Sequence, residues 1–166
     1  MTLKILQEAL CFAFLYSEFL VILFVKKGAK SQIQNYPDAI QKRCIDLGIT
    51  TKEEIVKNAK IYKTLGVMIM LLMNLFIICA MNEETSFIQG FIQSYIFILM
   101  FSLFDALFID SIWFCHSKFW IIPGTEDMTH EYHNYAFHWK WFLLSLISTI
   151  PLSIIIGGLT YCIGNA

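Results

Sequence analysis

The chain has 166 residues, enough for one domain, and a formal net charge of −1 at pH 7. Hydrophobic residues make up 57% of it and charged residues only 15%, and the mean hydropathy is +0.62. Soluble domains carry about 25% charged residues, so this composition excludes an ordinary soluble domain and favours one that buries apolar side chains in lipid. The chain has no excess of basic residues that would indicate a nucleic-acid partner, and we expect no nucleic acid to bind.

Four apolar segments are long enough to cross a bilayer, which takes about 20 residues. They cover residues 5–25, 61–81, 87–114 and 141–164. The sequence therefore predicts one all-α domain over residues 1–166, an integral membrane four-helix bundle with cytoplasmic loops at 26–60 and 115–140. Thr51 and Glu54 form the capping-box pattern T-x-x-E, so we expect the second long helix to begin there, before it enters lipid.

The basic residues are divided unevenly between the two ends of these segments. Eleven of the twelve lysines and arginines lie within or beside residues 26–60 and 115–140, and Lys4 alone lies at the other end. Short cytoplasmic loops carry the excess of Lys and Arg in membrane proteins. We therefore expect both termini on the non-cytoplasmic side, and the protein in the plasma membrane. The first segment is longer than a signal-peptide core and is followed by Lys26 and Lys27, which is typical of an anchor.

A short helix is predicted inside the first cytoplasmic loop, between Pro37 and Gly48. Its apolar face consists of Tyr36, Ile40, Cys44 and Leu47. Two interpretations remain open. In the first, the helix lies on the inner leaflet, with Lys42 and Arg43 facing anionic lipid headgroups. In the second, it packs on the neighbouring loop.

Acidic residues within the apolar segments are the most informative candidates for function. A charge at the bilayer centre costs at least about 2.5–3.5 kcal/mol on insertion scales. Glu18, Asp105 and Asp110 all fall in the cytoplasmic half of their segments, and His116 follows the third segment closely. We predict these four as a catalytic set. Asp105 and Asp110 are five residues apart, which is roughly 140° around an α-helix, so both can face one site only with the help of a kink.

Two of these acids have a purely structural role as the alternative. In that case Glu18 is hydrogen-bonded to Ser17 or to a neighbouring helix, and it stabilises the contact between helices without taking part in a reaction. Asp110 is then an anchor near the interface, paired with Lys118 or Lys140.

Three of the four histidines lie in residues 129–142, THEYHNYAFHWKWF. His130 and His133 are three residues apart and not four, so the stretch is not the zinc-protease motif H-E-x-x-H. Together with His138 and Glu131 they still offer donors for a divalent metal, and we predict these four as ligands of zinc, manganese or iron. Two alternatives stay open: proton exchange by the imidazoles, and an aromatic belt at the membrane surface that includes them.

The sequence favours a membrane enzyme, metal-dependent and acting on a lipid or amphiphile at the cytoplasmic mouth of the bundle. A small proton- or cation-coupled transporter or channel is the alternative, as a homo-oligomer packed through Ser153, Gly157, Gly158 and Gly164 of the fourth segment. Pro151 is expected to bend that segment. A haem held between His116 and His138, and a non-catalytic subunit that docks a soluble partner, are further alternatives.

Overall fold

The computed structural model describes residues 2–166, and within them every regular element is a helix. The long segments are α1 (Thr2–Lys27), α3 (Lys52–Leu75) with the π-helix η2 (Phe76–Met81), α4 (Phe87–Phe104) with the π-helix η3 (Asp105–Phe114), and α6 (Tyr135–Ser148) with α7 (Ile150–Gly164). The short elements are the 3₁₀-helices η1 (Ala29–Asn35) and η4 (Lys118–Trp120), and the helices α2 (Asp38–Asp46) and α5 (Thr129–Tyr132).

The prediction of an all-α chain with long apolar helices is confirmed. Three helical segments, Leu3–Lys27, Lys52–Met81 and Phe87–Phe114, are long and apolar enough to cross a membrane. The α6–α7 pair passes the same test as one bent segment. The number of possible spans is therefore three or four by length and hydropathy.

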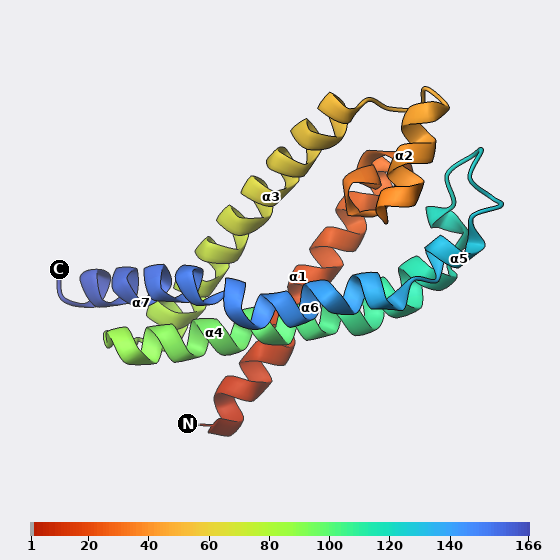
Figure 1. The fold of residues 1–166 in the computed structure, drawn as a ribbon. Coiled ribbons are helices and arrows are strands. Elements are labelled where there is room, and N and C mark those ends of the chain that lie inside the picture. Colours follow the sequence, from red (N-terminus) through yellow and green to blue (C-terminus); the bar gives the residue numbers. More distant parts are fainter. Residues whose placement is uncertain (1) are drawn as a thin grey trace.

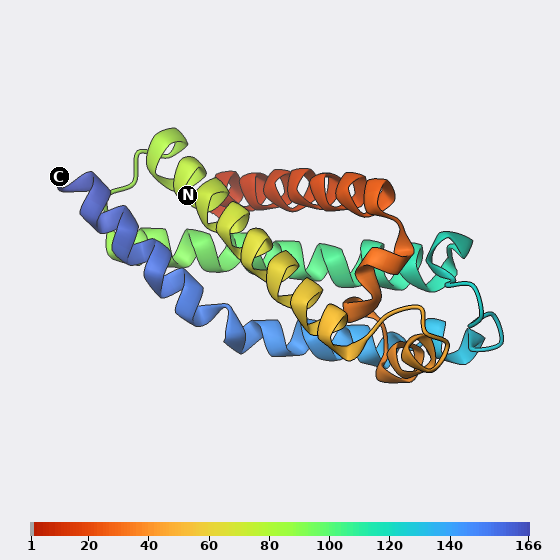
Figure 2. The ribbon, with the colours of Figure 1, turned by 90° about the horizontal axis from the view of Figure 1, so that it is seen from above.

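α4 is the central helix. It lies between α1 and the α6–α7 pair, and α3 crosses over it diagonally (Figures 1 and 2). Aromatic side chains fill the contact between α1 and α4: Phe12 stacks on Phe97 with ring centroids 5.8 Å apart, and Tyr16 meets Phe101 edge-on at 4.7 Å. Much of α3 stays exposed, as expected for a surface that faces lipid instead of protein.

Small residues let α4 and α7 approach closely. Gly90 lies against Thr160, and Gly164 lies against Thr85. At Gly157, a Cβ atom would stand 2.8 Å from the backbone oxygen of Phe87. The small residues of the fourth segment thus pack within the chain. Of the glycines that were predicted to form an oligomer face, only Gly158 has open space around it. Gly157 and Gly164 pack against α4 and the turn before it in the same chain, and homo-oligomerisation through this segment stays a prediction.

The break between α6 and α7 is a bend of 41°. Pro151 lies in the first turn of α7, where its ring prevents a continuous helix. The Tyr95 hydroxyl of α4 donates a hydrogen bond of 2.9 Å to the carbonyl of Leu146 beside the bend. The expected effect of Pro151 is confirmed.

The two ends of the molecule differ. Both termini and the turn at residues 82–86 lie at one end, and the connections 28–51 and 115–134 lie at the other (Figure 2). Lys4 Nζ donates to Asn82 Oδ1 at 2.7 Å, which ties the first helix to that turn.

The connections at the second end pack on each other as a small apolar unit, here called the loop cap. Its buried residues are Ile33, Tyr36, Ile40, Cys44, Ile55, Phe114, Cys115, Trp120, Ile122 and Tyr132. The apolar face of α2 is part of it: Ile40 and Cys44 are 0% exposed. Tyr36, Ile40 and Cys44 thus pack on the neighbouring loop, as in the second interpretation, and do not face lipid, whereas Leu47 of the same predicted face is 48% exposed. Headgroup binding by Lys42 and Arg43 stays a prediction, although Arg43 forms an ion pair of 2.6 Å with Asp127.

Two local signals in this region are confirmed. Gly48 follows α2 with a φ of +68°, a conformation that glycine adopts without steric penalty. The Thr51 side chain accepts from Glu54 N at 3.2 Å, and Glu54 Oε2 accepts from Thr51 N at 3.2 Å. This capping box begins α3 at Lys52.

Hydrogen bonds of two tyrosines hold the loop cap together. Tyr36 donates to the Trp120 carbonyl at 2.8 Å, which joins the two connections. The Tyr132 hydroxyl lies 2.6 Å from Thr125 Oγ1 and accepts from Ile122 N at 3.0 Å. Burial raises the pKa of both Tyr36 and Tyr132 above the ordinary tyrosine value, so both hydroxyls stay neutral where a free tyrosine begins to ionise.

Candidate functional site

The third apolar segment changes its helical geometry where its acids occur. From Asp105 to Phe114 it is a π-helix, in which hydrogen bonds join residues five apart. Cys115 N donates to the Asp110 carbonyl, and Ser111 Oγ donates to the Ala106 carbonyl at 2.6 Å. Positions 105 and 110 therefore lie nearly above one another on adjacent turns. The separation of about 140° expected for an α-helix does not apply, and no kink is needed.

Asp110 contacts a histidine on α6, the helix that leads into the fourth apolar segment. His138 Nδ1 on α6 lies 3.2 Å from Asp110 Oδ2, with 4% of the histidine side chain and 23% of the aspartate side chain exposed. The imidazole packs against the rings of Phe114 and Phe137, at centroid distances of 4.8 and 5.2 Å. Asp110 thus pairs with His138 instead of with Lys118 or Lys140.

The second nitrogen of this imidazole is unsatisfied. His138 Nε2 is buried and has no hydrogen-bond partner in the described part of the chain. A carboxylate beside Nδ1 favours a proton on that nitrogen, which leaves Nε2 as the acceptor in the neutral ring. When Nε2 takes up a proton, the imidazolium is already paired with a carboxylate. The pair can therefore bind a proton without leaving an isolated charge among aromatic rings.

His116 lies elsewhere, on the exposed surface of the same end. Its Nε2 is 2.8 Å from the Tyr135 hydroxyl, and its ring centroid is 5.5 Å from that of His133. His133 Nδ1 is in turn 2.7 Å from the Thr129 carbonyl. These contacts involve neither Asp110 nor His138.

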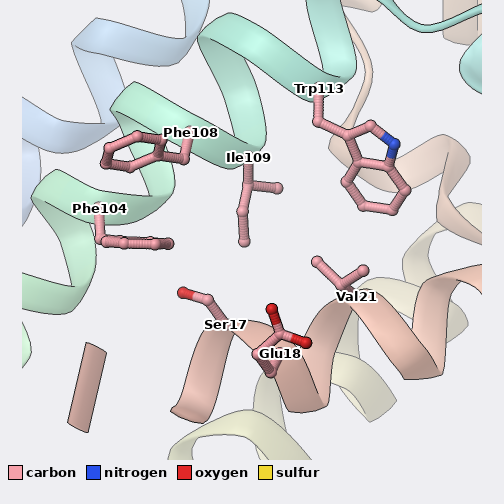
Figure 3. A pocket seen from close by; sticks show the side chains of 7 residues that line it. All are labelled: Ser17, Glu18, Val21, Phe104, Phe108, Ile109 and Trp113. Atoms are coloured by element: carbon pink, nitrogen blue, oxygen red, sulfur yellow. The ribbon is translucent and has the colours of Figure 1, made fainter. Parts of the chain in front are cut away.

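Glu18 is also apart from the Asp110–His138 pair. It lines a groove of about 290 Å³ between α1 and η3, together with Ser17, Val21, Phe104, Phe108, Ile109 and Trp113 (Figure 3). The Ser17 hydroxyl is buried without a hydrogen-bond partner among residues 2–166, so the predicted bond between Glu18 and Ser17 does not form. Of the predicted catalytic set, Asp105 and Asp110 share one face of η3, whereas Glu18 and His116 have different surroundings.

The predicted metal ligands do not converge. His130 is 96% exposed, with Nδ1 3.9 Å from Glu131 Oε1, whereas His138 is buried beside Asp110. Across residues 2–166, no group of three or more His, Cys, Asp or Glu side chains is arranged to hold a metal ion. The structure gives the predicted zinc, manganese or iron site no support.

Sequence reasoning missed a polar network at the opposite end, which includes the side chains of Glu8 and Glu84. Asn82 Nδ2 donates to Glu8 Oε2 at 2.8 Å and to Gln93 Oε1 at 2.9 Å. Gln93 Nε2 donates to Glu84 Oε1 at 3.1 Å, and Gln93 is only 1% exposed. A glutamine within the apolar run of α4 was the available signal. The network joins α1, the turn and α4.

Comparison of the chain with protein-family models, with curated proteins and with solved structures found no match.

Proposed function

We propose that this chain is a four-span integral membrane protein that binds and transfers protons at the Asp110–His138 pair. Three apolar helical segments and the bent α6–α7 pair support the four spans. Eleven of the twelve basic residues belong to the end that carries the loop cap, which supports a cytoplasmic loop cap and non-cytoplasmic termini. The plasma membrane is the proposed location.

The observation that carries the proton proposal is the buried pair itself, with Nδ1 and Oδ2 3.2 Å apart and Nε2 unsatisfied within residues 2–166. Ionisable groups inside a bundle are costly and mark proton or ion pathways in membrane proteins. Imidazole is the side chain whose charge changes most readily near neutral pH.

Other protonatable groups extend the site in both directions. Asp105 lies one π-helical turn deeper than Asp110 along η3. Toward the loop cap, Tyr135 precedes His138 by three residues on α6 and contacts the exposed His116 at 2.8 Å. Protonatable groups thus lie both deeper than the pair and nearer the surface, and the proposed proton path would pass between Tyr135 and His138, whose side chains no hydrogen bond joins within residues 2–166.

A membrane enzyme is the second candidate, because a carboxylate-oriented imidazole is also the arrangement of a general base. It ranks lower for two reasons. No hydroxyl or thiol of residues 2–166 is within hydrogen-bond reach of His138 Nε2, and these residues form no metal cluster.

Proton flux into proteoliposomes tests the proposal. A potassium diffusion potential drives uptake, and an internal pH dye records it. We expect the wild-type protein to conduct protons and Asp110→Asn to reduce the rate at least tenfold. His130→Ala is the matched control, because this exposed histidine lies outside the pair, and it should retain the wild-type rate. Wild-type protein without flux, or Asp110→Asn with full flux, would contradict the proposal.

The topology has a separate test in variants that carry one cysteine on a background without the native five. A membrane-impermeant maleimide should label a cysteine at Asn165 in intact cells and a cysteine at Lys42 only after lysis. The reverse pattern would place the loop cap outside.

A further inference from the structure

The groove beside Glu18 has the features of a ligand site. Its lining side chains come from two elements, α1 and η3 with the last residue of α4, and they surround a space of about 290 Å³ (Figure 3). Glu18 is exposed at the rim of this space, on the outside of the helix bundle. If the helices span a bilayer as proposed above, the groove opens sideways into lipid.

The polar groups of this groove lack partners from the protein. Glu18 belongs to none of the ion pairs or side-chain hydrogen bonds found among residues 2–166. The neighbouring Ser17 is only 3% exposed, and its buried hydroxyl points into the space without an acceptor or donor in that part of the chain (Figure 3). A buried hydroxyl without a partner loses the free energy of a hydrogen bond. A ligand with polar atoms in the groove would restore it.

The remaining walls are aromatic. Phe104 and Phe108 pack against each other with centroids 4.5 Å apart, and the Trp113 ring faces the space from the next turns of η3 (Figure 3). Aromatic faces attract cations, and this attraction increases when water is excluded. One carboxylate among three aromatic rings is therefore complementary to a cation that has an apolar body.

We propose that the Glu18 groove binds the protonated or quaternary ammonium group of a lipophilic amine, whose apolar tail leaves the groove into the bilayer. The ammonium group would neutralise the Glu18 carboxylate and contact the aromatic walls. The inference rests on the membrane placement proposed above, but not on proton transfer at Asp110 and His138.

The depth of Glu18 favours a free amine over a phospholipid headgroup. Nine residues separate Glu18 from Lys27, the last residue of α1, which corresponds to about 13 Å at the helical rise. A phospholipid would have to draw its charged phosphate to this depth, whereas a lipophilic amine carries only the cation that the carboxylate attracts. An anionic amphiphile would be repelled.

Binding of dodecylammonium, whose primary ammonium group has N–H donors for Ser17 Oγ, by purified protein in phosphatidylglycerol nanodiscs tests the proposal. Equilibrium dialysis with labelled probe gives the dissociation constant, and nanodiscs without protein give the background. We expect saturable one-site binding, weakened at least tenfold by Glu18→Gln and severalfold by Ser17→Ala. Glu53→Gln, an exposed acid in the first turn of α3, is the control and should not change the affinity. Equal affinity in wild type and Glu18→Gln would overturn the proposal.

Two further arms identify the source of the ammonium group. Dodecanol, which has the same chain length without the charge, should not compete. Nanodiscs that contain phosphatidylcholine should leave the affinity unchanged, and loss of binding there would overturn the assignment to a free amine. Asp110→Asn should bind the probe as wild type does, so that a failure of proton transfer and a failure of the amine site can be told apart.

Discussion

His138 on α6 and Asp110 on η3 form a contact of 3.2 Å that joins the third and fourth apolar segments inside an aromatic environment. The residues are 28 positions apart in the sequence. The contact forms because the π-helix turns Asp110 toward α6, and the rings of Phe114 and Phe137 hold the imidazole in place.

The first prediction concerns the coupling between these two side chains. Asp110→Ala and His138→Ala should each destabilise the protein, because each leaves a buried polar partner unpaired. The double variant should lose less free energy of unfolding than the sum of the two, with a coupling of about 1–3 kcal/mol. Unfolding in mixed detergent micelles measures it. His130→Ala should change the stability by less than about 0.5 kcal/mol. If the effects of the two single variants on the free energy of unfolding simply add, the two side chains do not stabilise the protein through their contact.

The second prediction compares two adjacent glycines of α7. Gly157→Ala places a Cβ 2.8 Å from the Phe87 oxygen and 3.1 Å from Phe91 N, and both atoms belong to the backbone of α4. The helices must move apart, so we expect a loss of about 1–3 kcal/mol in the free energy of unfolding. Gly158→Ala meets nothing within 4 Å and should be neutral or stabilising by up to about 1 kcal/mol. The same unfolding assay tests both, and equal effects would mean that α7 does not pack on α4 through Gly157.

The third prediction is the pH dependence of the loop cap. The pKa of Tyr36 is raised by burial above its ordinary value of 10.0, so the folded state keeps the proton that the unfolded chain releases. The contribution of Tyr36 to stability is therefore complete below about pH 10 and decreases as the pH rises further. Near-ultraviolet circular dichroism should show the cap unfolding in this alkaline range.

A phenylalanine variant isolates this contribution. Tyr36→Phe loses the 2.8 Å bond to the Trp120 carbonyl, at a cost of about 1–2 kcal/mol at neutral pH, and should show a weaker dependence on alkaline pH. Tyr161→Phe, an exposed site on α7, is the control. An alkaline transition identical in Tyr36→Phe and wild type would exclude Tyr36 as its cause.

Much of the fold could be predicted from local patterns. Hydropathy located the long helices, T-x-x-E marked the start of α3, and Pro151 marked the bend, because each signal acts within a few residues. The packing partners could not be predicted. The small residues of α7 indicate that another helix approaches closely, but they do not show which helix it is. The apolar face of α2 is compatible with burial in lipid as well as in protein.

The candidate site was predicted in part. Asp110 and His138 were both chosen from the sequence, but for different roles, one catalytic and one as a metal ligand. The π-helix was the missing information, because an α-helical period places Asp105 and Asp110 on different faces. Glu18 and His116 were grouped with them by depth alone, and equal depth does not place residues on facing sides of a bundle.

Proton flux in proteoliposomes that carry His138→Gln tests the central claim most directly, because this variant removes the imidazole of the Asp110–His138 pair. We expect the rate of proton uptake to fall at least tenfold below that of the wild-type protein, as in Asp110→Asn. His133→Ala removes an imidazole outside the pair and should retain the wild-type rate. Full flux in His138→Gln would contradict a proton-transferring pair.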